Sequence, residues 1–129
     1  MRNLLTLICA CFVAFAYAQE MTSGGKLKPE QAIMDIRHYT VALNVDPTQK
    51  SIDGYAEIDF ITSQPTKTLL FDFTNVLTVR KIWVNKKEHL YTHKDNLITI
   101  IAASPFPAGK INVKVQYDGK PDVAARPPW

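Results

Sequence analysis

Cysteine is nearly absent from this sequence of 129 residues, and its two copies, Cys9 and Cys11, lie close to the amino terminus. Residues 19–129 contain none, which excludes both a disulfide framework and a thiolate metal site in that part of the chain. No apolar run after residue 18 is long enough to cross a membrane. The net charge of +3 is mild and the basic residues are scattered, which argues against a nucleic-acid partner.

The usual catalytic signatures are also missing. The sequence has no Gly-x-Ser-x-Gly elbow, no P-loop and no dinucleotide fingerprint. None of its three histidines is followed by glutamate, so the metalloprotease signature H-E-x-x-H is absent. The residues alone therefore indicate a scaffold or a binding module, with no catalytic or metal residue and with any substrate-binding residues unknown.

Residues 1–18 have the features of a signal peptide. Arg2 precedes residues 4–17, which are apolar except for one threonine, and residues 16–18 form the small-x-small pattern Ala-Tyr-Ala. We expect cleavage between Ala18 and Gln19, and hence an exported protein that is periplasmic, secreted or on the cell surface. A buried helix is the alternative for this run, and a lipoprotein site is disfavoured because the run continues beyond both cysteines.

Cleavage would leave 111 residues and a net charge of +2, because the removed segment carries Arg2 alone. Residues 19–34 are mostly polar and include Gly24, Gly25 and Pro29, which predicts a linker or arm. Residues 35–129 are long enough for one domain that buries roughly two-thirds of its unfolded surface.

Apolar and polar residues alternate along most of residues 38–117, which predicts half-buried strands. The inward-facing sets of the three clearest segments are Tyr39, Val41, Leu43 and Val45; Ala56, Ile58 and Phe60; and Ile111, Val113, Val115 and Tyr117. We expect an irregularity near Arg80 and Lys81, a hairpin turn at residues 94–96, and interruptions at Pro105 and Pro107. With about seven strands and no helix of ~10 residues, the fold class is all-β, an antiparallel β-sandwich or saddle-like sheet domain.

Two clusters could suggest a metal site. His89 and His93 are four residues apart, but on a strand this spacing separates them by about 13 Å, so a solvated strand face is the favoured interpretation over zinc. Asp53, Glu57 and Asp59 could gather at one strand end and bind calcium. Their spacing lacks the calcium-loop pattern, and Glu57 and Asp59 fit a solvated strand face.

A resemblance to a known family lies in the order of several short motifs. Residues 35–60 begin with Asp35-x-x-His38-Tyr39 and continue through a turn to Ile52-x-Gly54 and a second strand. The segments TLLFDF, VRKIWVN and INVKVQYDGKP follow. Together they resemble the amino-terminal β-domain of the aminopeptidase N family of zinc metallopeptidases, over roughly residues 35–129.

The resemblance implies that the chemistry lies elsewhere. In that family zinc is bound by H-E-x-x-H and a distant glutamate in a later, thermolysin-like domain, and a Gly-x-Met-Glu-Asn segment binds the substrate amine. Neither motif is present, so we expect no cofactor in this chain, and zinc only in the parent protein. The family's chain continues past the segment ending at Trp129, so we expect a non-catalytic fragment. Its partner would be the missing catalytic domain, through which alone it would meet peptide substrates.

The alternative is a free-standing secreted β-sandwich that binds a glycan or a protein. It depends on four aromatic residues that could be exposed, Tyr55, Trp83, Tyr91 and Trp129. Packing in a core or against another domain is the favoured explanation for such residues, because aromatic side chains dominate both kinds of interior. A third alternative, an inhibitor that mimics the enzyme's own domain, has no feature in the sequence that tests it.

Overall fold

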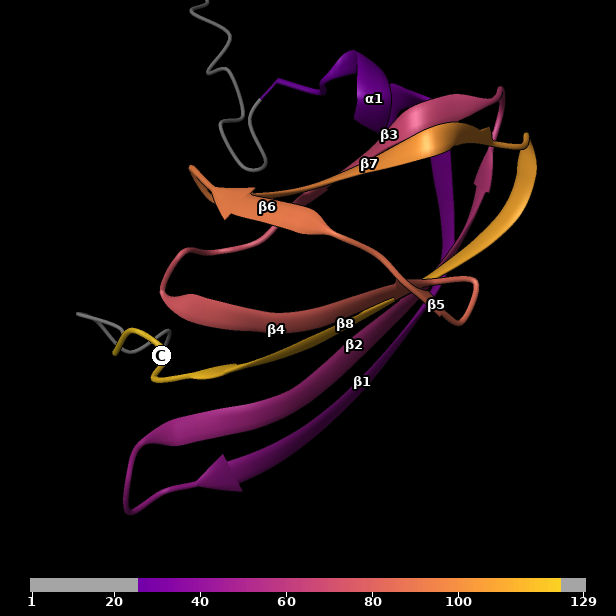
Figure 1. The fold of residues 1–129 in the computed structure, drawn as a ribbon. Helices are drawn as coiled ribbons and strands as arrows, with labels where there is room; N and C mark the ends of the chain where they lie inside the picture. The colour runs from indigo at the N-terminus through magenta and orange to yellow at the C-terminus, as the bar shows by residue number, and fades with distance from the viewer. Residues whose placement is uncertain (1–25, 124–129) are drawn as a thin grey trace, which may run out of the picture.

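The computed structural model describes residues 26–123, which form eight strands and one helical turn (Figure 1). The signal peptide, its cleavage site at Ala18 and Gln19, both cysteines and Trp129 lie outside the described residues. The elements are α1 (Pro29–Ala32), β1 (Met34–Asp46), β2 (Ser51–Thr62), β3 (Thr66–Asp72), β4 (Leu77–Val84), β5 (Lys87–Glu88), β6 (Tyr91–Lys94), β7 (Leu97–Phe106) and β8 (Gly109–Gly119). No helix within residues 26–123 has the length and apolar character needed to cross a membrane.

The strands form two antiparallel sheets. The larger sheet has the order β1-β2-β8-β4-β5 and the smaller has the order β3-β7-β6. Figure 1 shows the smaller sheet above the inner face of the curved larger one, with α1 beside β3. The predicted all-β antiparallel fold is confirmed, with eight strands where about seven were expected.

The hydrophobic core lies between the two sheets. Cross-strand rows of the larger sheet place Ile58, Val113 and Val84 side by side, all nearly fully buried. Opposite them the smaller sheet contributes the fully buried side chains of Leu69 and Ile100. Burial of branched apolar side chains of this kind contributes about 1.5–3 kcal/mol each, so this interior is the main source of stability.

The irregularities of the ladder follow the sequence closely. The register between β4 and β8 shifts between Val79 and Lys81, as expected for this region, because Arg80 forms a bulge. Strand β7 continues through Pro105, contrary to the prediction that this proline ends it. Its ladder with β3 nevertheless jumps from Ile101 to Phe106, because proline has no N–H to donate there.

Strand β1 differs most from expectation. Its alternating side chains face inward as predicted, but they are exposed rather than half-buried, with Val41 at 56% and Val45 at 60%. Within the described residues the smaller sheet does not extend over this edge, as Figure 1 shows for the free ends of β1 and β2. Periodicity indicates which side a residue faces but not whether another layer covers that side.

The segment predicted as a polar arm contains local structure near its end. Pro29 begins the single turn α1, where its fixed φ suits the first helical position. The side-chain amide of Gln31 donates a hydrogen bond of 2.8 Å to Asp72 at the end of β3. The turn is thereby attached to the smaller sheet.

Candidate functional site

The histidines do not form a metal centre. His93 lies in β6, where its Nε2 is 3.1 Å from the carbonyl oxygen of Phe73 and its ring meets the Phe73 ring edge-on. His89 lies before β6 and is tilted against Phe106 with ring centroids 5.5 Å apart. Both side chains are half-buried, so the prediction of a solvated strand face is wrong for them, because aromatic rings pack against both.

The three carboxylates lie on the outer face of the larger sheet and accept hydrogen bonds from amide side chains. Asn112 donates to Glu57 at 3.1 Å and to Asp59 at 2.8 Å, and Asn44 donates to Asp53 at 3.0 Å. In the described part of the chain, no three His, Cys, Asp or Glu side chains are grouped so that they could hold a metal ion.

The described aromatic residues that were considered for ligand binding already contact other groups of this chain. Tyr91 points inward between the sheets and donates a hydrogen bond of 2.8 Å to the carbonyl of Val79. Tyr55 faces outward, but the ammonium group of Lys114 lies 3.7 Å from its ring centroid and covers one face. Trp83 is half-buried beside the same lysine, since Lys114 is its cross-strand neighbour.

Within residues 26–123 two groups have shifted pKa values, and neither lies in a catalytic arrangement. Arg80 donates hydrogen bonds of 2.6 and 2.9 Å to Asp118, and these bonds together with the carboxylate charge raise the pKa of the guanidinium. Burial raises the pKa of the Tyr117 hydroxyl, whose ring packs edge-on against Phe73 at 5.0 Å. Both act as structural groups, one closing the β4 bulge and one filling the core.

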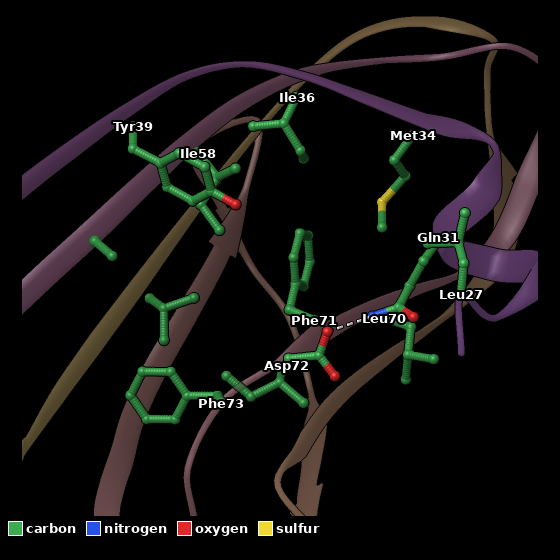
Figure 2. A pocket seen from close by; sticks show the side chains of 13 residues that line it. Leu27, Gln31, Met34, Ile36, Tyr39, Ile58, Leu70, Phe71, Asp72 and Phe73 are labelled. Atoms are coloured by element: carbon green, nitrogen blue, oxygen red, sulfur yellow. Dashed lines mark hydrogen bonds between the residues drawn. The ribbon is translucent and has the colours of Figure 1, made fainter. Parts of the chain in front are cut away.

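An apolar groove lies at the open side of the sandwich (Figure 2). It encloses about 350 Å³ between α1, β1, β3 and the larger sheet. Figure 2 shows Met34, Ile36 and Tyr39 along one side and Phe71 and Phe73 along the other. The complete lining is Leu27, Gln31, Met34, Ile36, Tyr39, Ala56, Ile58, Leu70, Phe71, Asp72, Phe73, Ile98 and Val115.

Polar groups are few in this groove. The hydrogen-bonded pair of Gln31 and Asp72 lies at its rim, and the hydroxyl of Tyr39 is the other polar side-chain group of the lining. The lining holds no histidine, cysteine, serine or lysine, so it has none of the usual nucleophiles or general bases apart from the paired carboxylate. The geometry therefore suits the binding of apolar side chains rather than a reaction.

The groove continues into an open apolar face along β1, which we call the β1 face. It consists of Tyr39, Val41, Leu43 and Val45, exposed to 56%, 56%, 45% and 60%. Isolated exposed apolar residues are ordinary, but a contiguous row that continues a core marks an interaction surface. The sequence predicted the row itself, whereas its exposure depends on the size of the smaller sheet, for which the sequence has no local signal.

Comparisons with known proteins show the fold but not the family. No family model matches the sequence, and no curated protein matches it significantly. The fold is similar to that of part of an M1 zinc metallopeptidase from Deinococcus radiodurans, with a TM-score of 0.63 and 17% identity over 77% of this chain and 23% of that one.

Two further solved structures show a similar fold over about the same part of the chain. A mutant of the same Deinococcus radiodurans enzyme bound to a Tyr-Ser-Ala substrate gives a TM-score of 0.63 at 17% identity, over 73% of this chain and 22% of that one. A two-domain M1 zinc metallopeptidase mutant bound to L-arginine gives 0.62 at 17% identity, over 76% and 23%. The chain thus spans less than a quarter of the length of the structures it matches.

Proposed function

We propose that this chain is the amino-terminal β-domain of an exported zinc metallo-aminopeptidase, and that its role is to support a catalytic domain rather than to catalyse. The observation that carries the proposal is the fold likeness to M1 zinc metallopeptidases over about three-quarters of this chain. The order of the motifs from Asp35 to the segment ending at Pro121 points to the same family.

The proposed docking surface is the β1 face with the adjoining groove. Its four side chains are still about half exposed, so covering them would stabilise a complex by roughly 1 kcal/mol each, or about 4 kcal/mol together. An apolar surface of this kind is typical of a domain that packs permanently against another, because such interfaces resemble a core divided in two.

Zinc does not fit the described residues of this chain. His38 lies on the outer face of β1, whereas His93 lies in β6 of the other sheet with a ring nitrogen against the Phe73 carbonyl. A catalytic zinc site needs about three protein ligands converging on one ion. Catalysis would therefore come from a separate part of the parent protein.

The first test is the transcript beyond codon 129. We expect the reading frame to continue and to encode Gly-x-Met-Glu-Asn and H-E-x-x-H. An expressed transcript with a stop codon directly after codon 129 would overturn the proposal. So would zinc-dependent release of amino acids from aminoacyl-anilides by the purified chain alone.

The second test uses the downstream region expressed as a separate polypeptide. We expect it to co-purify with this chain, and the double variant Val41→Asp/Leu43→Asp to lose that association. The matched control is Ile101→Asp, which alters an apolar strand residue that is 68% exposed on the smaller sheet. Equal binding by the double variant and the control would exclude the β1 face as the docking surface.

A further inference from the structure

Strand β1 is the longest unprotected edge among the described strands. At the opposite edge of the larger sheet, β5 has only two residues, Lys87 and Glu88, both charged. Charged residues and short length are the usual devices that prevent edge-to-edge pairing. Strand β1 has 13 residues, and its segment from His38 to Asp46 contains no lysine and no proline.

The orientation of the β1 backbone identifies which polar groups are free. The carbonyl oxygen of Ala42 points at β2, since a Cβ placed on Gly54 would lie 2.0 Å from it. Alternation along an antiparallel strand then turns the N–H and C=O groups of Val41 and Leu43 outward, away from β2. Within residues 26–123 no strand pairs with these outward groups.

A second copy of the same strand fits this edge in one register. With Ala42 on a two-fold axis, antiparallel pairing places Val41 opposite Leu43 and Tyr39 opposite Val45, so the apolar rows of both copies join on one face. Cross-strand apolar pairs of this kind are favourable, and the outward N–H and C=O groups become paired.

The ends of the segment support the same register. The register of β1 against β2 shifts between Ile36 and His38, and Pro47 follows the other end of the strand. In the pairing centred on Ala42, bulged Arg37 lies opposite Pro47 of the second copy, so both irregular positions coincide and the regular ladder is uninterrupted between them. A shift of the centre by one residue would place Pro47 opposite Tyr39 or Asp35.

The polar side chains that face each other across the proposed ladder also fit this register. The same register sets His38 opposite Asp46 of the second copy, twice in the symmetric pair. Opposite-charge and hydrogen-bonding pairs directly across a ladder are favourable, whereas like charges there are unfavourable. We propose that two copies of this chain associate through β1 in this register and form one continuous antiparallel sheet. The pairing uses the edge of β1 and the proposed function uses its inner face, so either can fail alone.

Cross-linking tests the register directly in the full chain carrying Cys9→Ser and Cys11→Ser. Ala42→Cys would bring two Cα atoms to about 4.5 Å, within the range of a disulfide, so we expect a covalent dimer on mild oxidation. Asn44→Cys is the control, because its two copies would be about 14 Å apart, four residues out of register. Equal cross-linking of both variants, or none of Ala42→Cys, would overturn the proposal.

Sedimentation equilibrium of the full chain tests the association itself. We expect a reversible dimer that Val41→Lys converts to a monomer, whereas Ile101→Lys leaves it intact. His38→Asp should weaken dimerisation about tenfold, and Thr92→Asp, an exposed strand position of β6, should not. Circular dichroism checks the folding of each variant. If Val41→Lys does not fold, the cross-linking experiment is the deciding test of the dimer. The proposed association through β1 would be refuted if the chain is a monomer at all concentrations, or if a folded Val41→Lys variant still forms the dimer.

Discussion

Replacement of Gly54 by alanine should separate the first two strands of the larger sheet. Gly54 pairs with Leu43, and an added Cβ would lie 2.0 Å from the carbonyl oxygen of Ala42 and 3.0 Å from its carbonyl carbon. Ordinary van der Waals contact begins near 3.4 Å, so the strands must move apart locally by roughly 1.4 Å. A shift of that size along the hydrogen-bond direction breaks the bonds on either side of the contact.

The expected loss of stability is the sum of the broken hydrogen bonds and the crowding around the added Cβ. Two lost ladder hydrogen bonds contribute about 1 kcal/mol each, and the remaining crowding adds at least about 1 kcal/mol. We therefore expect Gly54→Ala to lower the free energy of unfolding by about 3 kcal/mol, a large fraction of the 5–15 kcal/mol typical of a domain. Urea denaturation followed by circular dichroism measures this change, and a thermal melt should shift down by about 12 °C or more.

Gly109→Ala is the control for backbone conformation. Gly109 has a φ of 118°, which also disfavours an L residue, but a Cβ there meets nothing within 4 Å. Its substitution should cost less than Gly54→Ala, because backbone strain of about 1–3 kcal/mol acts there without any added clash. If Gly54→Ala unfolds at the urea concentration of the unmodified protein, or if Gly109→Ala is the more damaging change, the close approach of β1 and β2 is not a determinant of stability.

Three further predictions concern the core, a turn and the response to alkali. Ile100→Ala should cost about 2–5 kcal/mol in urea unfolding because Ile100 is fully buried, whereas Ile101→Ala, at an exposed neighbour, should change stability by less than about 0.5 kcal/mol. Lys86→Gly should raise the free energy of unfolding by up to about 1 kcal/mol, because Asn85 and Lys86 have φ values of 49° and 69° that suit an Asn-Gly turn. Burial raises the pKa of Tyr117 in the folded state, so stability should fall as pH rises above about 10; Tyr117→Phe should reduce that fall, as urea titrations at pH 8 and pH 10.5 would measure.

Much of the fold could be predicted from local patterns, because half-buried strands leave a period-two record. Strand β8 alternates inward Val113 and Val115 with outward Lys114, as its sequence indicates. The bulge at Arg80 was also predictable, because the apolar alternation breaks there. What these features share is that neighbouring residues along the chain determine them.

The candidate site was less predictable because it depends on contacts between distant segments. The half-burial of His93 arises from Phe73, 20 residues earlier, and the rim of the groove joins Gln31 to Asp72. The exposure of the β1 face depends on where the smaller sheet ends. None of these facts has a local signature, so alternation predicted the orientation of Val41 but not its exposure.

The order of strands in the larger sheet also constrains when the domain can form during synthesis. Strand β8, the last of the described strands to be made, lies between β2 and β4, and Gly119 at its end pairs with both Ile52 and Leu77. The β1–β2 hairpin and the smaller sheet have all their residues earlier, but the larger sheet stays divided until residues 109–119 leave the ribosome. Ribosome-bound chains that stop before residue 109 should consequently remain sensitive to protease.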